Sequence, residues 1–533
     1  MKVVLGVIVL ISYVASSNLR VDPLVLIEQG LVRGQRAEDG DYTTFLGIPY
    51  AAVDENNPFG SAKPPAAFEE EIYKANDGTI RCPQTLFVNF TLGAGTETLD
   101  CLRLNIYVPN EATSKNPLPV LVWIHGGGFE LGSASSYNVI SLVNKGIVVV
   151  TINYRMGPYG FMCLDVPSVP GNQGLKDQYA ALQWVRNNIG SFGGNPYNVT
   201  VAGDSAGACS TLLHLYSSKD KLFHKVIVQS GTPQNEGMFV NGDVDAAKKL
   251  ANYLGFNTDD TEQALEFLAK TPFDLVTAAT VKLDLQLKPC QERSFSGVEN
   301  FVETDPYSLS NEKKISGTPI LIGHTSKEEM SLMSSFYEGY YRDDPFYTRI
   351  LLNYNLSEEK ARKVADTIRH FYIGDKEISQ QQFSEFGDFE SDFIFNHPMQ
   401  RMITKLLNES PAALYQYLFS YVGNSGKAGA GHGEELKYLF QSSSSSASED
   451  DKLVAERMVA MWANFIKTGN PTPSDDSTLP VTWTKSSLAV RPYLLIDKDL
   501  KMESRLFNER MAFWDLFNDS YGTYNKLARN CNI

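Results

Sequence analysis

The hydrophobic positions of this 533-residue chain fall largely into short, uninterrupted runs. Each run is rich in β-branched residues and is bounded by turn-forming residues. Continuous apolar runs of this kind are typical of strands that are buried on both faces, as in a parallel sheet. We therefore predict strands at Val120–Ile124, Ile147–Ile152, Val199–Ala202, Val226–Val228, Ile320–Ile322 and Leu414–Phe419.

Helical patterns lie between these runs. In the clearest one, apolar side chains recur at spacings of three and four residues along one helix face, at Leu175, Tyr179, Leu182, Val185 and Ile189. Alternating strands and helices predict an α/β fold with a mostly parallel central sheet, helices on both faces and helical insertions. Because no long linker separates the strands, we expect residues 18–533 to form a single domain.

The first residues have the pattern of a secretory signal peptide. Lys2 precedes an apolar run from Val3 to Val14, and small residues follow at positions 15–17. The run is shorter than the roughly 20 residues that span a bilayer. We expect residues 1–17 to be removed and the mature protein to be secreted, without a membrane anchor.

Composition and charge exclude several classes of protein. With 43% hydrophobic and 20% charged residues, the chain is neither disordered nor fibrous. Its net charge of −15 repels phosphate backbones, so we expect no nucleic-acid partner. These numbers leave the oligomeric state open.

In a secreted protein, cysteines can form disulfides and glycosylation motifs can be modified. Cys82 and Cys101 enclose a short segment, and a bridge between them would contribute about 3 kcal/mol through chain entropy. Cys209 lies in an apolar helical run and is expected to be a buried small hydrophobe. No local partner is evident for Cys163, Cys290 or Cys531.

The Asn-x-Ser/Thr motif of N-glycosylation occurs five times. Asn198 lies beside a predicted strand and is the least favoured of these positions. The candidates for glycosylation are therefore Asn89, Asn355, Asn408 and Asn518.

A G-x-S-x-G pattern, Gly203 to Gly207, directly follows the predicted strand Val199–Ala202 and precedes an apolar helical run. It is typical of a nucleophile elbow, in which small neighbours allow a serine to occupy a tight strand-to-helix turn. The turn presents the hydroxyl at the carboxyl end of the sheet, beside a helix N-terminus that favours negative charge. An ordinary turn serine is the alternative, but this position favours Ser205 as a nucleophile.

A glycine-rich segment, His125-Gly126-Gly127-Gly128-Phe129, follows the predicted strand Val120–Ile124. Consecutive glycines let backbone N–H groups approach a substrate oxygen closely, as an oxyanion hole for acyl transfer requires. A flexible loop is the alternative. The presence of Ser205 favours the catalytic interpretation.

A serine nucleophile needs a base, and in this type of fold the chain order is nucleophile, acid, histidine. His370 ends an amphipathic run and His397 precedes a proline in an aromatic segment, so we interpret both as structural. His432 lies in a glycine-rich loop after the strand Leu414–Phe419, and we predict that it is the base. The chain has seven histidines in all, at positions 125, 214, 224, 324, 370, 397 and 432.

Two adjacent glutamates are candidates for the acid. Glu328 and Glu329 follow the predicted strand Ile320–Ile322. One of them should accept a hydrogen bond from the imidazole, fix its tautomer and stabilise the imidazolium. Spacing alone does not choose between them, and a solvated helix start is the alternative interpretation of the pair.

Together these elements resemble the type-B carboxylesterase/cholinesterase family of α/β-hydrolases, and within it the secreted insect-type esterases. Further similar segments occur in the same order along most of the chain. They are Phe45–Ala51, Asp100–Asn105, Pro170–Gln178, Phe192–Pro196 and Tyr438–Phe440.

The resemblance implies a role for each of these motifs. Ser205 would be the nucleophile and His432 the base. The N–H groups of Gly127, Gly128 and Ala206 would form the oxyanion hole. The resemblance also implies a disulfide between Cys82 and Cys101.

The acid of the family usually stands in the pattern Gly-x-x-x-x-Glu-Gly, which from Gly323 selects Glu328. Glu329 departs from the pattern because it stands where the family has glycine. A second carboxyl there crowds a small position and adds charge beside the acid, which bears on catalytic efficiency. Ser230, in Gln229-Ser230-Gly231, matches a family serine that helps to hold the acid.

For function, the resemblance implies a serine esterase that works through an acyl-enzyme and needs no metal or organic cofactor. Its substrates would be small or medium apolar esters, such as odorant, pheromone, dietary or xenobiotic esters. Residues 83–100 lack the tryptophan that binds choline in cholinesterases, which argues against charged choline esters. Asp204 stands where juvenile-hormone esterases usually have glutamine, which argues against hormone specificity.

Other functions on this scaffold remain alternatives. A non-catalytic binding or adhesion protein is one, although such relatives typically lack a catalytic residue. A stoichiometric scavenger that is acylated once and then stalls is another, because of Glu329. A triacylglycerol lipase is the nearest enzymatic alternative.

Overall fold

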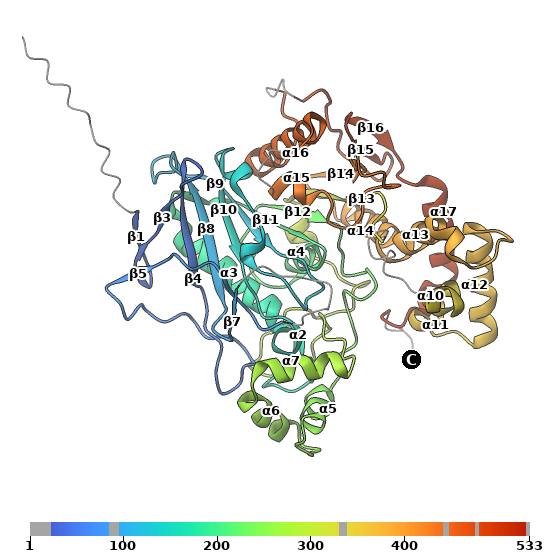
Figure 1. The fold of residues 1–533 in the computed structure, drawn as a ribbon, viewed down its shortest axis with the longest axis horizontal. Coiled ribbons are helices and arrows are strands. Elements are labelled where there is room, and N and C mark those ends of the chain that lie inside the picture. The colour runs from blue at the N-terminus through green and yellow to red at the C-terminus, as the bar shows by residue number, and fades with distance from the viewer. Residues whose placement is uncertain (1–22, 85–94, 330–337, 441–446, 475–478, 529–533) are drawn as a thin grey trace, which may run out of the picture.

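The computed structural model describes residues 23–84, 95–329, 338–440, 447–474 and 479–528. Within these ranges, eleven strands form one sheet that runs through the molecule, in the order β16-β15-β14-β13-β12-β11-β9-β10-β8-β4-β3 (Figure 1). Their bounds are β3 Gln35–Arg36, β4 Tyr42–Pro49, β8 Arg103–Pro109, β9 Leu118–Ile124, β10 Val148–Ile152, β11 Gly194–Asp204, β12 Lys225–Gln229, β13 Pro319–Thr325, β14 Ala413–Phe419, β15 Pro492–Ile496 and β16 Lys501–Ser504.

The centre of the sheet is parallel, from β10 through β9, β11, β12, β13 and β14 to β15. Its edges are antiparallel, where β8 pairs with β10 and β16 pairs with β15. The six predicted strands are confirmed as β9 to β14. The antiparallel edge strands were not predicted, because they lack the continuous apolar runs of strands buried on both faces.

Side chains of the central strands alternate between two apolar cores. On β9, Val120 and Val122 pack on the face covered by α3 (Gln173–Asn188) and α4 (Ala206–Tyr216). Leu121 and Trp123 pack on the opposite face, beneath α16 (Glu449–Thr468). The predicted helix that contains Leu175 is confirmed as α3, and the sheet is covered by helices on both faces as expected.

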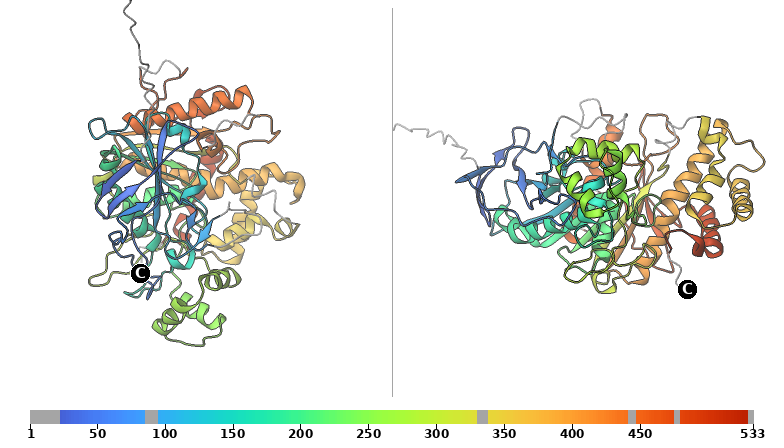
Figure 2. Two further views of the ribbon diagram at one scale, coloured as in Figure 1. Left: turned by 60° about the vertical axis from the view of Figure 1, so that its left-hand side comes forward. Right: turned by 90° about the horizontal axis from the view of Figure 1, so that it is seen from below.

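Two helical groups extend beyond the sheet. One lies at the bottom of Figure 1 and comprises α5 (Ala246–Tyr253), α6 (Thr261–Lys270) and α7 (Phe273–Lys282). The other has its own aromatic core around Phe346, Phe389 and Trp514, and lies at the end of the molecule opposite the amino-terminal strands (Figure 2). It comprises α10 (Glu338–Arg342), α11 (Pro345–Asn353), α12 (Glu358–Tyr372), α13 (Phe383–Ser391) and α17 (Asn508–Tyr521).

Shorter elements complete the described fold. The helix α14 (His397–Asn408) leads back from the second helical group to the sheet. Two small sheets lie near the amino terminus, one made of β1, β2 and β5 and the other of β6 and β7. The remaining elements are β1 Leu24–Ile27, β2 Gly30–Arg33, β5 Ile72–Lys74, β6 Ile80–Arg81, β7 Thr96–Glu97, α1 Ile140–Val143, α2 Gly157–Phe161, α8 Glu312–Ile315 and α15 Leu436–Phe440.

Two disulfides join segments of the chain. One links Cys82 to Cys101, and the other links Cys163 to Cys290 across 127 residues. The second pairing was not predicted, because its partners lie far apart in the sequence. Cys209 is buried and unpaired, as expected of a small core residue, and Cys531 lies outside the described residues.

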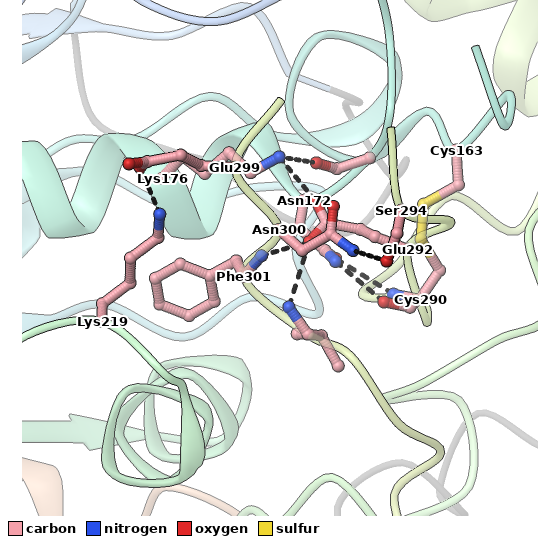
Figure 3. A network of polar contacts seen from close by, with 12 residues as sticks. Cys163, Asn172, Lys176, Lys219, Cys290, Glu292, Ser294, Glu299, Asn300 and Phe301 are labelled. Atoms are coloured by element: carbon pink, nitrogen blue, oxygen red, sulfur yellow. Dashed lines mark hydrogen bonds and ion pairs between the residues drawn. A yellow bond between two sulfur atoms is a disulfide. The ribbon is translucent and has the colours of Figure 1, made fainter. Parts of the chain in front are cut away.

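A polar network surrounds the second disulfide (Figure 3). The Asn172 side chain accepts a hydrogen bond from Cys290 N at 3.0 Å and donates one to Cys290 O at 2.8 Å. Lys176 forms an ion pair with Glu292 at 2.5 Å, and Glu292 also accepts a hydrogen bond from Val302 N. Segment 290–302 is therefore tied to the chain just after α2 by a covalent bond and to the start of α3 by buried polar contacts.

In the described ranges, no helix is long and apolar enough to cross a membrane. The expected signal peptide and the glycosylation motif at Asn89 lie outside these ranges.

Candidate active site

Ser205 lies on the turn between β11, which ends at Asp204, and α4, which begins at Ala206. Its backbone has φ 56° and ψ −120°, a conformation that costs about 1–3 kcal/mol for a residue with a side chain. The Ser205 N–H donates to Gln229 O at 2.8 Å, which links the turn to β12. The strained turn is therefore held by the neighbouring strand, and Ser205 retains 6% of its surface exposed.

Glycines surround this turn because the backbone segments approach one another closely. A Cβ at Gly207 would overlap Ile124 O on β9, and one at Gly231 would overlap Ser205 O. No larger residue fits at either position without moving the backbone. The small residues of the G-x-S-x-G pattern thus allow α4 to start directly against the sheet.

The glycine-rich segment after β9 lies beside Ser205, because β9 and β11 are parallel neighbours whose carboxyl ends meet at one edge. A Cβ at Gly126 would lie 3.1 Å from Ser205 Cβ. Gly127 and Gly128 have φ values of 108° and 63°, which favour glycine. Among the described residues, no hydrogen bond from the N–H groups of Gly127, Gly128 or Ala206 to a protein acceptor is present. These donors are therefore free to bind an oxygen.

His432 and Glu328 are joined by a hydrogen bond of 2.6 Å between Nδ1 and Oε2. They follow β14 and β13, which are neighbouring parallel strands. The backbone is also joined here, since His432 N–H donates to Glu328 O at 3.0 Å. The ring of Phe395 packs 4.9 Å from the imidazole, so the ring plane of His432 is held from two sides.

The Glu328 carboxyl is fully buried, and its second oxygen is held by other groups. Ser230 Oγ donates to Oε1 at 2.6 Å, and Thr325 N–H donates to the same oxygen at 2.8 Å. Burial alone would raise the pKa of Glu328, but the charge of His432 and the hydrogen bonds from His432 and Ser230 bring that pKa below its ordinary value. Glu328 is therefore ionised and has a fixed orientation.

The interaction between the two residues has the opposite effect on the pKa of His432. Burial alone would lower the pKa of the imidazole, but the charge of Glu328 and its hydrogen bond raise that pKa above its ordinary value, with Asp204 and Glu329 adding to the effect. Among the described residues, no hydrogen bond joins Ser205 Oγ to His432. Such contacts often form fully only when substrate is bound.

Sequence reasoning missed a cluster of buried carboxyl groups around this pair. Burial raises the pKa of Asp204 to about 7, with nearby Glu328 adding to the shift. Burial and the neighbouring Asp204 raise the pKa of Glu435 to about 8. Glu435 follows His432 by three residues, so a search for acidic residues near the predicted base could have identified it.

Glu329 lies beside a second network of charged residues. Its N–H donates to Ser391 Oγ at 3.1 Å, and burial with the nearby Glu390 raises the pKa of its carboxyl to about 7. Arg349 bridges Glu390 and Glu236, at 2.8 Å and 2.7 Å. The residue that departs from the family pattern is thus 5% exposed and lies between the His432 pair and this network.

The described residues hold no group of three or more His, Cys, Asp or Glu side chains arranged to bind a metal ion. What the site offers is a serine on a strained elbow, a carboxylate-bound imidazole and free backbone donors. A large, mostly parallel sheet with these groups at its carboxyl edge defines an α/β-hydrolase.

Comparison with known proteins gives the family. The profile of the carboxylesterase family matches residues 21–514, and the chain belongs to that family. It is an enzyme of the carboxylesterase class, which acts on esters.

Two insect relatives illustrate the similarity in sequence. The chain is 32% identical over 498 residues to juvenile hormone esterase of Heliothis virescens, which covers 85% of this chain and 87% of that protein. It is also 32% identical over 486 residues to esterase FE4 of Myzus persicae, with 84% of each chain covered.

A solved structure shows the same similarity in three dimensions. Juvenile hormone esterase from Manduca sexta, with OTFP covalently attached, superimposes with a TM-score of 0.80 and 27% sequence identity. The superposition covers 93% of this chain and the whole of that chain.

Proposed function

We propose that this protein is a secreted serine esterase with Ser205 as nucleophile, His432 as base and Glu328 as the acid that orients the base. The observation that carries the proposal is the 2.6 Å hydrogen bond from His432 to a Glu328 carboxylate that is itself held by Ser230. It lies at the same sheet edge as the strained Ser205 turn.

In the acylation step, His432 Nε2 takes the proton of Ser205, and the serine oxygen attacks the ester carbonyl. The N–H groups of Gly127, Gly128 and Ala206 stabilise the tetrahedral oxyanion, each contributing about 3 kcal/mol to lowering the barrier. His432 then protonates the leaving alcohol. Glu328 stabilises the imidazolium during this transfer.

In the deacylation step, water takes the place of the alcohol. His432 removes a proton from the water, whose oxygen attacks the acyl-enzyme, and Ser205 leaves with the proton returned to it. The carboxylic acid is released. The residues that act in the first step also act in the second, so no further group is required.

For substrates, we propose small to medium apolar esters. The similarity to juvenile hormone esterases makes a hormone-type ester a candidate, but Asp204 at the elbow, in place of their usual glutamine, favours a general esterase. Acyl-chain-length preference distinguishes an esterase from a triacylglycerol lipase.

We also propose that the protein is secreted and N-glycosylated, because of the signal-peptide pattern at residues 1–17 and the Asn-x-Ser/Thr motifs. Asn355 and Asn408 are exposed and Asn518 is half-buried. Asn198 is engaged instead, because it lies within β11 and its side chain donates to Lys467 O at 3.1 Å.

The test is hydrolysis of p-nitrophenyl acetate with burst-phase resolution, for the native protein and for Ser205→Ala. We expect turnover that falls by roughly a million-fold in the variant, the loss typical of a triad nucleophile. The exposed Ser218, just beyond α4, supplies a matched control, and Ser218→Ala should retain activity.

Other outcomes point to the alternatives. A stoichiometric burst without turnover indicates impaired deacylation and a scavenger. The absence of any Ser205-dependent signal with simple esters contradicts the esterase proposal and favours a binding protein.

A further inference from the structure

A cavity with a volume of about 670 Å³ lies between α14, α17, the start of β15 and the end of β16. None of Ser205, Glu328 and His432 lines it. We call it the basic cavity because its wall includes Arg401, Lys405, Arg491 and Arg505. Its volume is in the range of pockets that hold small organic ligands, about 300–1,000 Å³.

The four cations of the basic cavity lack acidic partners. Among the described residues, no carboxylate lies within ion-pair distance of any of them. Most other partly buried lysines and arginines pair with carboxylates, as Arg349 does. In a protein with a net charge of −15, a cluster of unpaired cations is a local reversal of sign. Such a cluster favours an anion.

Contacts within the wall hold the cations in place. Arg401 lies over the ring of Tyr307 at 5.1 Å, and Lys405 Nζ donates to Tyr307 O at 3.2 Å. Arg491 donates to Thr404 Oγ1 at 3.1 Å. Burial and the nearby Arg505 lower the pKa of Arg491, and the charge of Asp515 offsets part of this effect, so the guanidinium groups of Arg491 and Arg505 lie close enough to repel each other. An oxyanion between them would relieve their repulsion.

The opposite wall is polar and carries fewer charges. Asp515 and Asp519 lie one turn apart on α17. Asp515 contacts His397 at 3.2 Å, and its charge also acts on Arg491 without an ion pair between the two side chains. Counting side chains, four cations face two carboxylates, which leaves an excess of two positive charges. Five of the ten other lining residues carry amides, which exchange hydrogen bonds with hydroxyl groups.

Several polar atoms of the wall have no hydrogen-bond partner. Among the described residues these include Gln234 Oε1, Gln400 Nε2 and Arg491 Nε. Gln234 is 8% exposed and lines the cavity. Buried polar atoms without a protein partner are uncommon, so these three side chains, which line the cavity, have unused hydrogen-bonding capacity.

From these observations we infer that the basic cavity binds a small, hydroxyl-rich organic anion that carries a phosphate or sulfate monoester, such as a phosphorylated or sulfated sugar. A phosphate monoester, with nearly two negative charges at neutral pH, matches the charge excess of the arginine and lysine wall, and a sulfate monoester, with one, matches half of it. Hydroxyl groups match the amides and aspartates opposite. The inference does not depend on the esterase proposal, because the cavity shares no residue with the triad.

Two glycosylation motifs border the cavity, since Asn408 and Asn518 both line it. A glycan on either asparagine would compete with a free ligand. Ser410→Ala and Ser520→Ala abolish the motifs and leave both asparagines in the wall, so this double variant is the background for the test.

The experiment is calorimetric titration of the full-length secreted protein with glucose 6-phosphate, glucose 6-sulfate, glucose and inorganic phosphate. We expect one site that binds both charged sugars, with inorganic phosphate weaker and glucose undetectable. Arg401→Gln and Arg491→Gln should each raise Kd about tenfold or more, since each removes a charge-assisted hydrogen bond. The affinity should also fall with added salt.

Arg36→Gln is the matched control, because Arg36 is an exposed arginine on β3, remote in the chain from the cavity. Thermal unfolding verifies that each variant is folded, and Lys405→Gln replaces either arginine variant that is not. Ser205→Ala should bind the sugars as the native protein does, which separates this test from that of the esterase. No binding of the charged sugars, binding unaffected by the cavity substitutions, or equal affinity for inorganic phosphate would overturn the inference.

Discussion

Backbone strain in the site falls on two serines that come from different strands. Ser205 and Ser230 have φ values of 56° and 54°, and each follows the last residue of its strand. A serine there bends the chain sharply, and the Ser230 hydroxyl donates to Glu328. At the residue scale, the site depends on a few contacts whose removal has defined consequences.

The first prediction concerns Glu329 and the pH profile. In the proposed mechanism His432 acts as a base and must be neutral, and the ionised Glu329 contributes to raising its pKa. Glu329→Gln removes that charge, so the acid limb of kcat/KM should move to lower pH, by up to about one unit. The shift will be partial, because the pKa of Glu329 itself is raised to about 7 and its charge is incomplete near neutrality. The measurement is kcat/KM against pH.

Glu377→Gln provides the control for this prediction, since Glu377 is an exposed glutamate after α12. It should leave the profile unchanged. A profile of Glu329→Gln that coincides with that of the native protein, or that moves to higher pH, would contradict the electrostatic role.

The second prediction concerns Ser230 as a positioning residue. Its hydroxyl donates a hydrogen bond of 2.6 Å to Glu328 Oε1, the carboxylate oxygen that does not contact His432. Hydrogen bonds to charged groups contribute about 1.5–3 kcal/mol, so Ser230→Ala should lower kcat about tenfold or more with little change in KM. Steady-state kinetics measure this split, and a change confined to KM would argue for a role in substrate binding instead.

At the scale of elements, the site is assembled by neighbouring parallel strands. The turns after β9, β11, β12, β13 and β14 all lie at the carboxyl edge of the sheet. They supply the glycine-rich segment, Ser205, Ser230, Glu328 and His432 in turn. The close approach of α4 to β9 keeps Ser205 against the glycine-rich segment.

This close approach leads to the third prediction. At Gly207 a methyl group would overlap Ile124 O, so Gly207→Ala must push α4 away from β9. We expect a lower melting temperature and a fall in kcat/KM, because a displacement of about 1 Å at a catalytic group costs about a hundredfold. Thermal unfolding and esterase assays measure the two effects.

Gly190→Ala is the matched control, since nothing lies within 4 Å of a Cβ at that position. It should retain activity and stability, or become slightly more stable through the stiffer unfolded chain. Equal melting temperatures and equal kcat/KM for the two variants would show that α4 and β9 can accommodate a methyl group at Gly207 and would contradict the prediction.

At the scale of the whole molecule, the two disulfides constrain very different lengths of chain. The Cys163–Cys290 bridge closes a loop of 127 residues that contains both Ser205 and Ser230, whereas Cys82–Cys101 closes 19. The longer bridge is reinforced by the Asn172 and Lys176 contacts. It therefore holds the elbow region together as one unit.

The fourth prediction follows from these loop lengths. Chain entropy assigns about 5 kcal/mol to the longer loop and about 3 kcal/mol to the shorter one. Cys163→Ala/Cys290→Ala should therefore lower the free energy of unfolding more than Cys82→Ala/Cys101→Ala does. Urea unfolding of the two double variants under identical conditions tests this order, and the reverse order would contradict the entropic account.

Patterns within short stretches of the sequence were enough to identify the strands β9 to β14, the helix α3 and the nucleophile elbow. Burial on both faces makes a strand uniformly apolar, and a tight turn demands small residues, so both features can be recognised locally. The same reasoning singled out Ser205, His432 and the Glu328–Glu329 pair. It could not choose within that pair without the family pattern.

Other features depend on contacts between distant parts of the chain. The His432–Glu328 hydrogen bond spans 104 residues and the second disulfide 127. The buried cluster of Asp204 and Glu435 and the basic cavity likewise join separate elements. Periodicity records which face of an element is buried, but not which strand lies next to which. These contacts arise only when the order of strands in the sheet brings their turns to one edge.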